Sequence, residues 1–230
     1  MQYHEFDGIR LSQLGMGAMR LPQTEPGFAK PIDEPKAMEL IDCCISHGVN
    51  YFDTAYIYHM GQSEVLLGKA LKRYPRDSFC VADKFNVQAE PDYEKQFARQ
   101  LERLQMDRID FYLLHNLGEG RTHFFDDFDL WSWVQEKKAE GFIKHVGFSF
   151  HSTPEELEEI LNKHPEMEFV QLQINYADWE NSAIQSRGCY EVARKHGKPV
   201  IIMEPVKGGM LANPPESVAD ILKTAEPDSS

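Results

Sequence analysis

Short apolar runs recur along this chain of 230 residues, and five of them end at or beside a polar residue. Amphipathic sequence of helical period fills the intervals, and strands that alternate with helices are typical of a parallel sheet covered by helices. In a barrel of such units, the carboxyl ends of the strands face one mouth, so the pattern predicts a site there. The five polar residues are Asp53, Lys84, His115, Ser149 and Gln173, at successive intervals of 31, 31, 34 and 24 residues.

Further apolar runs extend this series toward both ends of the chain. An Asp-Gly pair between apolar residues predicts a tight hairpin over residues 1–13. Residues 14–17 are predicted to form the first barrel strand, and residues 199–203 the seventh. The sequence that follows offers one weak helix over 217–225 and a frayed tail over 226–230, with no eighth strand.

The helices between the strands have start and stop signals of known physical origin. Asp33, Asp92 and Thr153 are predicted N-caps, because their side-chain oxygens can accept from free amides of the first turn. Gly48 and Gly141 follow the predicted ends of two helices.

These elements predict an α/β fold of the (β/α)8 TIM-barrel type with an N-terminal β-hairpin. A complete barrel takes about 250 residues, so we expect an incomplete barrel of about seven strands. Residues 1–230 are interpreted as one domain that lacks the C-terminal part of this barrel.

Composition narrows the class of partner. Lys and Arg number 24 against 37 Asp and Glu, and the formal net charge of -13 disfavours nucleic acid and anionic membranes. No apolar run reaches the 18 or so residues that a membrane helix needs. The four cysteines show no C-x-x-C spacing, which predicts no metal or iron–sulfur cluster within this chain. Reduced thiols and the lack of a signal-peptide pattern indicate a cytoplasmic protein.

Residues 53–71 carry the most specific pattern in the chain. Asp53-Thr54-Ala55-Tyr56-Ile57-Tyr58 is followed by Gly61-Gln62-Ser63-Glu64 and an apolar helix. With the hairpin, Lys84 and His115 in their places, the sequence from residue 1 to about 211 resembles the aldo-keto reductase family. The resemblance implies a (β/α)8 barrel and an oxidoreductase that reduces an aldehyde or ketone with NAD(P)H.

The resemblance also implies a catalytic tetrad of Asp53, Tyr58, Lys84 and His115. Tyr58 would act as the general acid, since the carbonyl oxygen must gain a proton as hydride arrives. A free tyrosine has a pKa of about 10, so a nearby Lys84 ammonium is expected to lower it. Asp53 would hold Lys84, and His115 would donate a hydrogen bond to the carbonyl oxygen.

Residues at the predicted mouth are implied to bind the cofactor, NADP(H) or alternatively NAD(H). Ser149 and Gln173 match the positions that hydrogen-bond the nicotinamide carboxamide, while Phe150 replaces the usual asparagine. Met203 stands where the family has an aromatic residue against the nicotinamide. The full set is Gly17, Met19, Asp53, Ser149, Gln173, Met203, Pro205, Lys207 and Gly208.

The sequence also departs from the family pattern. Residues 147–151, Gly-Phe-Ser-Phe-His, resemble a bacterial subgroup with a C-terminal ferredoxin-like module, whose cluster cysteines this sequence does not contain. The basic residues that clamp the adenosine 2′-phosphate are also missing after Leu211. The sequence is therefore interpreted as a truncated member of the family.

Each residue has a plainer interpretation when it is taken alone. Asp53 and Lys84 suit a buried salt bridge as well as they suit catalysis. Tyr58 alone is more typical of a surface loop, and His115 alone of the protein interior.

An alternative function therefore stays open beside carbonyl reduction. The chain could be a weak or inactive remnant that acts as an interaction or cofactor-sensing module and self-associates through its open barrel edges. The expected partner of an active chain is a small-molecule carbonyl substrate, whose identity the sequence leaves open.

Overall fold

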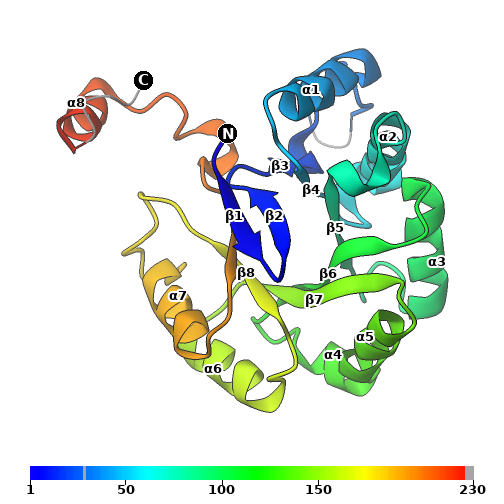
Figure 1. Ribbon diagram of the computed structural model, residues 1–230. Helices are drawn as coiled ribbons and strands as arrows, with labels where there is room; N and C mark the ends of the chain where they lie inside the picture. The colour runs from blue at the N-terminus through cyan, green and yellow to red at the C-terminus, as the bar shows by residue number, and fades with distance from the viewer. Residues whose placement is uncertain (28–29, 226–230) are drawn as a thin grey trace.

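A curved parallel sheet of seven strands forms the centre of the computed structural model, which describes residues 1–27 and 30–225 (Figure 1). The strands pair in chain order, as the prediction requires. They are β3 (Met16–Gly17), β4 (Tyr51–Asp53), β5 (Cys80–Phe85), β6 (Ile109–Leu117), β7 (Ile143–Phe150), β8 (Phe169–Gln173) and β9 (Val200–Met203). The fold prediction of an incomplete barrel is confirmed, and the predicted tail over 226–230 lies outside the described residues.

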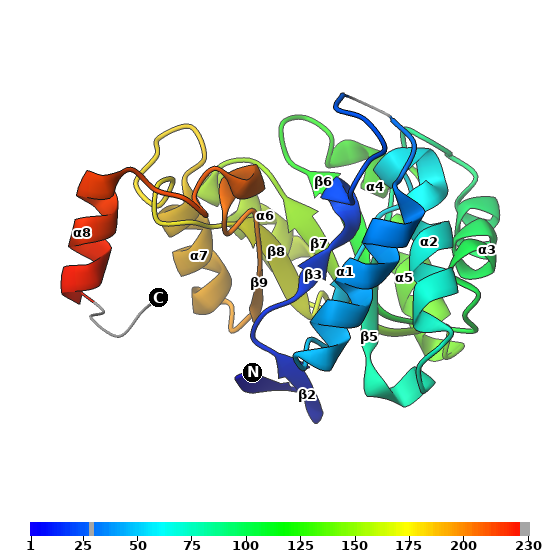
Figure 2. The same ribbon diagram turned by 90° about the horizontal axis from the view of Figure 1, so that it is seen from above.

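In the described ranges, seven α-helices pack along the outside of the curve, while an eighth stands apart from them (Figures 1 and 2). They are α1 (Glu34–Ser46), α2 (Gln62–Leu71), α3 (Tyr93–Leu104), α4 (His123–Asp127), α5 (Leu130–Ala139), α6 (Pro154–Lys163), α7 (Ser186–Lys195) and α8 (Glu216–Ala225). Among the described residues, no helix has the length and apolar character needed to cross a membrane.

The predicted N-caps are confirmed. Asp33, Asp92 and Thr153 each accept a hydrogen bond from the amide three residues later, at 3.3, 3.0 and 3.4 Å. These bonds satisfy amides that the first helical turn leaves free, so the helices begin at defined residues.

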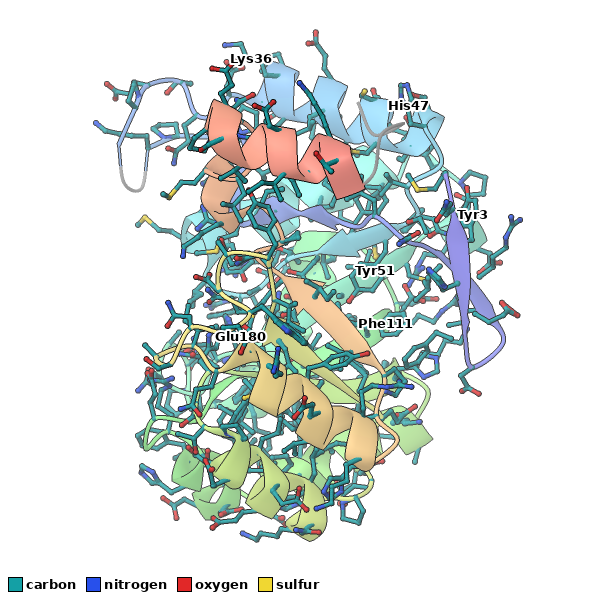
Figure 3. All side chains as sticks on the ribbon, turned by 90° about the vertical axis from the view of Figure 1, so that its left-hand side faces the viewer. Tyr3, Lys36, His47, Tyr51, Phe111 and Glu180 are labelled. Carbon is teal, nitrogen blue, oxygen red and sulfur yellow. The ribbon has the colours of Figure 1, made fainter. Side chains whose placement is uncertain are left out.

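Two apolar cores lie on opposite faces of the sheet. The larger one fills the space between the sheet and the outer helices. The smaller one fills the inside of the curve beneath the N-terminal hairpin of β1 (Tyr3–Phe6) and β2 (Ile9–Ser12). Tyr51 and Phe111 project toward that hairpin (Figure 3), and Phe6 packs edge-on against Phe111 at 5.2 Å between ring centroids. Since Phe111 lies near the start of β6, the hairpin covers the amino end of the barrel and leaves the carboxyl end open.

The first barrel strand is shorter than predicted. It contains Met16 and Gly17 but neither Leu14 nor Gly15, because Ser12 Oγ donates to the Leu14 carbonyl at 2.7 Å where the chain leaves the hairpin. Within the described residues, β3 pairs only with β4 and β9 only with β8. Self-association through these two edges stays a prediction.

Helices α2 and α3 approach each other closely at Gly68. A Cβ atom there would lie 2.5 Å from the Leu104 carbonyl oxygen. We expect Gly68→Ala to lower the free energy of unfolding by about 1–3 kcal/mol, because the helices must move apart. Urea denaturation measures this loss. Gly17→Ala is the matched control, since a Cβ at Gly17 meets no atom within 4 Å; equal losses in the two variants would contradict the close approach.

Candidate active site

The carboxyl ends of three neighbouring strands bring three of the predicted tetrad residues together. Asp53 ends β4, Lys84 is the penultimate residue of β5, and His115 lies two residues before the end of β6. Tyr58 reaches the same place from the loop after β4, as the first residue of a short 3₁₀ helix over Tyr58–Gly61.

The Lys84 ammonium is the centre of this group, with only 1% of the residue exposed. Its Nζ donates to Asp53 Oδ1, to the Thr54 carbonyl at 2.8 Å and to Tyr58 Oη at 3.5 Å. Burial opposes the charged form, but the acidic groups around Lys84, Asp53 foremost, together outweigh it and hold the pKa of Lys84 above its ordinary value. Lys84 is therefore a fixed cation beside the phenol.

Lys84 acts on Tyr58 in the predicted direction, but the net pKa of Tyr58 is raised rather than lowered. Burial raises the pKa of Tyr58, and the Lys84 charge offsets only part of that rise. The reason is that Tyr58 lies in a largely dry position, where the phenolate loses its hydration. Tyr58 is consequently a protonated phenol at neutral pH, which is the form that a proton donor needs.

His115, on β6, faces the phenol of Tyr58. Its ring centroid lies 6.0 Å from that of Tyr58 with the planes at 81°. Burial, followed by the Lys84 charge, holds the pKa of His115 well below its ordinary range. The imidazole is therefore neutral and keeps one N–H to donate. Its buried Nδ1 has no hydrogen-bond partner among the described residues, so packing alone does not account for a polar ring here.

A glutamine that the sequence analysis missed completes this group. Gln171 is 3% exposed, and its Nε2 donates to Asp53 Oδ2 at 2.8 Å. Asp53 is thus held by Lys84 through one oxygen and by Gln171 through the other. The two-residue period of β8 places Gln171 on the same face as Gln173, which is the signal that could have identified it.

The predicted carboxamide-binding residues lie on adjacent strands. Ser149 of β7 is paired in register with Gln171 of β8, and Gln173, two residues further along β8, is paired with Met203 of β9. Ser149 Oγ accepts from the Asn116 amide at 2.8 Å. Gln173 also lines a cavity of about 140 Å³ between the segments that follow β7 and β8.

A buried aspartate joins two of the predicted cofactor residues. Asp178, 1% exposed, accepts from Lys207 Nζ at 2.5 Å and from Gln173 Nε2 at 3.2 Å. Asn175 donates to the same carboxylate at 2.9 Å. No periodic pattern marks Asp178 or Asn175 in the sequence, since both lie in the irregular segment after β8.

The other predicted cofactor residues lie in or just after β3 and β9. Gly17 is paired in register with Asp53, and a Cβ at Gly208 would approach the Arg20 guanidinium. An ion pair of 2.6 Å joins Arg20, which follows β3, to Glu204, which follows β9. Met19 is half exposed and Pro205 is exposed, and in the described part of the chain no hydrogen bond joins either to a tetrad residue.

A second group of polar residues lies at the amino end of the barrel. One ligand atom from each of Asp7, His145 and Glu168 lies within 4.8 Å of the others. His145 Nδ1 is 2.9 Å from Glu168 Oε2, while Val146 N and Lys138 donate to the other oxygen of Glu168. Ordinary hydrogen bonding accounts for this arrangement, and the absence of a metal from this protein stays a prediction.

Comparison with known proteins supports the fold and identifies the family. The family model described as "Aldo/keto reductase family" matches residues 13–229. The chain belongs to this family. Among its curated relatives are a probable aldo-keto reductase of Glycine max, 28% identical over 183 residues, and an NADH-specific methylglyoxal reductase of Escherichia coli, 25% identical over 226 residues. These alignments cover 75% and 88% of this chain, but only 50% and 66% of the relatives.

Solved structures of aldo-keto reductases share the fold. The holo form of an enzyme from Bacillus halodurans has a TM-score of 0.70 at 28% identity, covering 94% of this chain and 70% of that one. A thermostable aldo-keto reductase solved with the inhibitor epalrestat has a TM-score of 0.77 at 25% identity, covering 98% and 79%. The predicted family resemblance is confirmed. The chain spans half to about two thirds of the length of the curated relatives it matches.

Proposed function

We propose that this protein is an NAD(P)H-dependent oxidoreductase that reduces an aldehyde or ketone to an alcohol. The observation that carries the proposal is the convergence of a buried ammonium, a protonated phenol and a neutral imidazole at the open end of the barrel. Structural ion pairing explains Asp53 and Lys84, but it does not explain why they are faced by Tyr58 and by His115, whose buried Nδ1 has no partner in the described residues.

Each residue has a separate part in this reaction. A reduced nicotinamide nucleotide, when bound, supplies the hydride. Tyr58 Oη gives its proton to the carbonyl oxygen, and Lys84 stabilises the phenolate that remains. His115 donates its N–H to the same oxygen and orients the carbonyl. Asp53 keeps the ammonium of Lys84 in position, so that little reorganisation is needed as charge develops.

The residues at the mouth suit a nicotinamide nucleotide chemically. Ser149 and Gln173 offer a hydroxyl and an amide, which complement a carboxamide. Lys207 offers a cation for a phosphate, with Asp178 holding it toward the same end of the sheet. The name of the Escherichia coli relative specifies NADH, which supports a nicotinamide cofactor here. The choice between NADPH and NADH is left to experiment.

The alternative of a non-catalytic interaction module is not favoured. All four tetrad residues lie together: the Lys84 ammonium pairs with the Asp53 carboxylate, and the His115 ring packs edge-on against Tyr58. The relatives are also named as reductases. The cytoplasmic location and the single-domain description of residues 1–230 stay predictions.

Titration of the protein with NADPH and with NADH, followed by fluorescence, tests the cofactor part of the proposal. We expect saturable binding, and Lys207→Met should weaken it by about tenfold to a hundredfold. The reason is the loss of a charge-assisted hydrogen bond to phosphate, worth about 1.5–3 kcal/mol. Lys198→Met is the matched control, because Lys198 precedes β9 and bonds the Pro165 carbonyl away from the mouth. No binding at millimolar cofactor by the folded protein would overturn the proposal.

A further inference from the structure

Two fully buried carboxyl groups lie behind Lys84, on the face of β5 that is turned toward the helices. Asp83 precedes Lys84 in the strand, and Glu64 comes from the first turn of α2; both are 0% exposed. Because side chains alternate along a strand, Asp83 points outward while Lys84 points into the barrel. The reaction proposed above uses neither carboxyl.

The hydrogen bonds leave one oxygen of each carboxyl without a donor in the described part of the chain. Asp83 Oδ1 accepts from the Lys84 amide at 2.8 Å, and Glu64 Oε2 accepts from Arg103 at 2.6 Å. The remaining oxygens, Asp83 Oδ2 and Glu64 Oε1, are buried with no donor among the described residues. The two carboxyls approach within hydrogen-bonding reach of each other. Two carboxylate oxygens both accept, so this contact forms only when one of them carries a proton.

The charges around Asp83 and Glu64 also indicate that one of these two carboxyls is protonated. Arg103 from α3 balances Glu64, and the Lys84 ammonium on the other face of β5 balances Asp53. A further ionisable neighbour in the described part of the chain is Tyr112 from β6, a buried phenol bonded to Gln100. Asp83 therefore has no cation of its own, and a second bare carboxylate in this core is costly.

We propose that Asp83 and Glu64 share a single proton, and that this protonated pair fixes Lys84 from behind as a pair of positioning residues. The proposal rests on the proposed function for its catalytic consequence only. The pair ties β5 to α2, and Arg103 extends the connection to α3. At the Lys84 backbone, the Asp83 carboxyl accepts from the amide while Gln100 Nε2 donates to the carbonyl at 3.2 Å. The main chain that carries the ammonium is thereby held on both sides.

The proton shared by Asp83 and Glu64 makes the free energy of unfolding depend on pH. Burial raises the pKa of Asp83 well above its ordinary value, and burial also raises that of Glu64, against the opposing effect of Arg103. A group whose pKa is higher in the folded state stabilises the fold most below its unfolded pKa of about 4. That contribution is lost as pH rises toward the folded pKa, and one proton makes the unfolding constant increase about tenfold per pH unit over this window.

Asp83→Asn tests the shared proton, because the amide keeps the shape and can donate permanently to Glu64 Oε1. We expect urea denaturation between pH 5 and pH 9 to show that this variant lacks the tenfold-per-unit contribution and gains stability over wild type as pH rises. Its infrared spectrum should lack the carbonyl band of a protonated carboxylic acid that wild type shows. Asp77→Asn is the control, since the Asp77 side chain is 92% exposed. Parallel pH curves for wild type and Asp83→Asn, with no band lost, would overturn the proposal.

Rescue by the conservative variant tests the positioning role. Asp83→Leu removes both hydrogen bonds of the carboxyl, and we expect kcat for carbonyl reduction to fall at least about tenfold with little change in KM. Asp83→Asn should recover most of that loss, whereas equal losses would reject positioning through hydrogen bonds. If wild type shows no reduction at all, the proposed function fails. The denaturation and infrared results then still decide whether the proton is shared.

Discussion

Tyr58→Phe is expected to abolish cofactor-dependent carbonyl reduction while the fold stays intact. The phenol lies beside Lys84, is protonated at neutral pH and is partly accessible, so its removal takes away the proposed proton donor. General acid catalysis contributes about 10²- to 10⁴-fold, and kcat should fall by at least that factor. Steady-state rates with a panel of aldehydes and ketones measure the loss.

Cofactor affinity provides the control for this variant. Tyr58 Oη accepts one long hydrogen bond of 3.5 Å from Lys84, so the change to phenylalanine removes little from the fold or the mouth. NADPH titration and circular dichroism should therefore match wild type. Turnover by Tyr58→Phe close to the wild-type rate would reject Tyr58 as the acid.

Residues on regular strands could be predicted from the sequence because their positions follow from periodicity. Asp53, Lys84 and His115 end or nearly end successive strands, and parallel pairing in chain order brings such positions to one edge. The same reasoning applies to Gln171, which precedes Gln173 by one strand period.

Residues on irregular segments could not be placed by periodicity. The approach of Tyr58 depends on the left-handed backbone of the next residues, with φ of 48° at His59 and 57° at Met60. Only the family resemblance indicated a role for this tyrosine. Asp178 likewise reaches Lys207 from an irregular loop. Such conformations depend on tertiary packing, which outweighs local preference.

The net pKa of Tyr58 was mispredicted for a related reason. The sequence shows that a lysine lies near the phenol, but burial is a property of the whole fold and opposes the phenolate more strongly. The buried carboxyls Asp83 and Glu64 were missed in the same way, because polar residues within apolar runs give no sign of their depth. Both corrections concern desolvation, which depends on every element packed around the group.

The Asp53–Lys84 pair is expected to produce the largest effect on stability. The side chains are 16% and 2% exposed, and among the described residues Lys84 Nζ has only the Thr54 carbonyl and the Tyr58 hydroxyl as further partners. Asp53→Asn leaves the ammonium without a counter-charge in a dry site. We expect the free energy of unfolding at neutral pH to fall by about 3–5 kcal/mol, the usual cost of breaking a buried pair from one side.

A double variant, Asp53→Asn with Lys84→Met, separates the cost of one unpaired buried charge from the loss of the two side chains themselves. Lys84→Met alone leaves the Asp53 carboxylate with Gln171 as its remaining donor, and it should also destabilise the fold. In Asp53→Asn with Lys84→Met, no charge is left buried, so the combined loss should be smaller than the sum of the single losses. Urea denaturation of the four proteins completes the cycle. Additive losses would show that the two charges do not interact, and Lys84 would then not be the fixed cation that the proposed reaction needs.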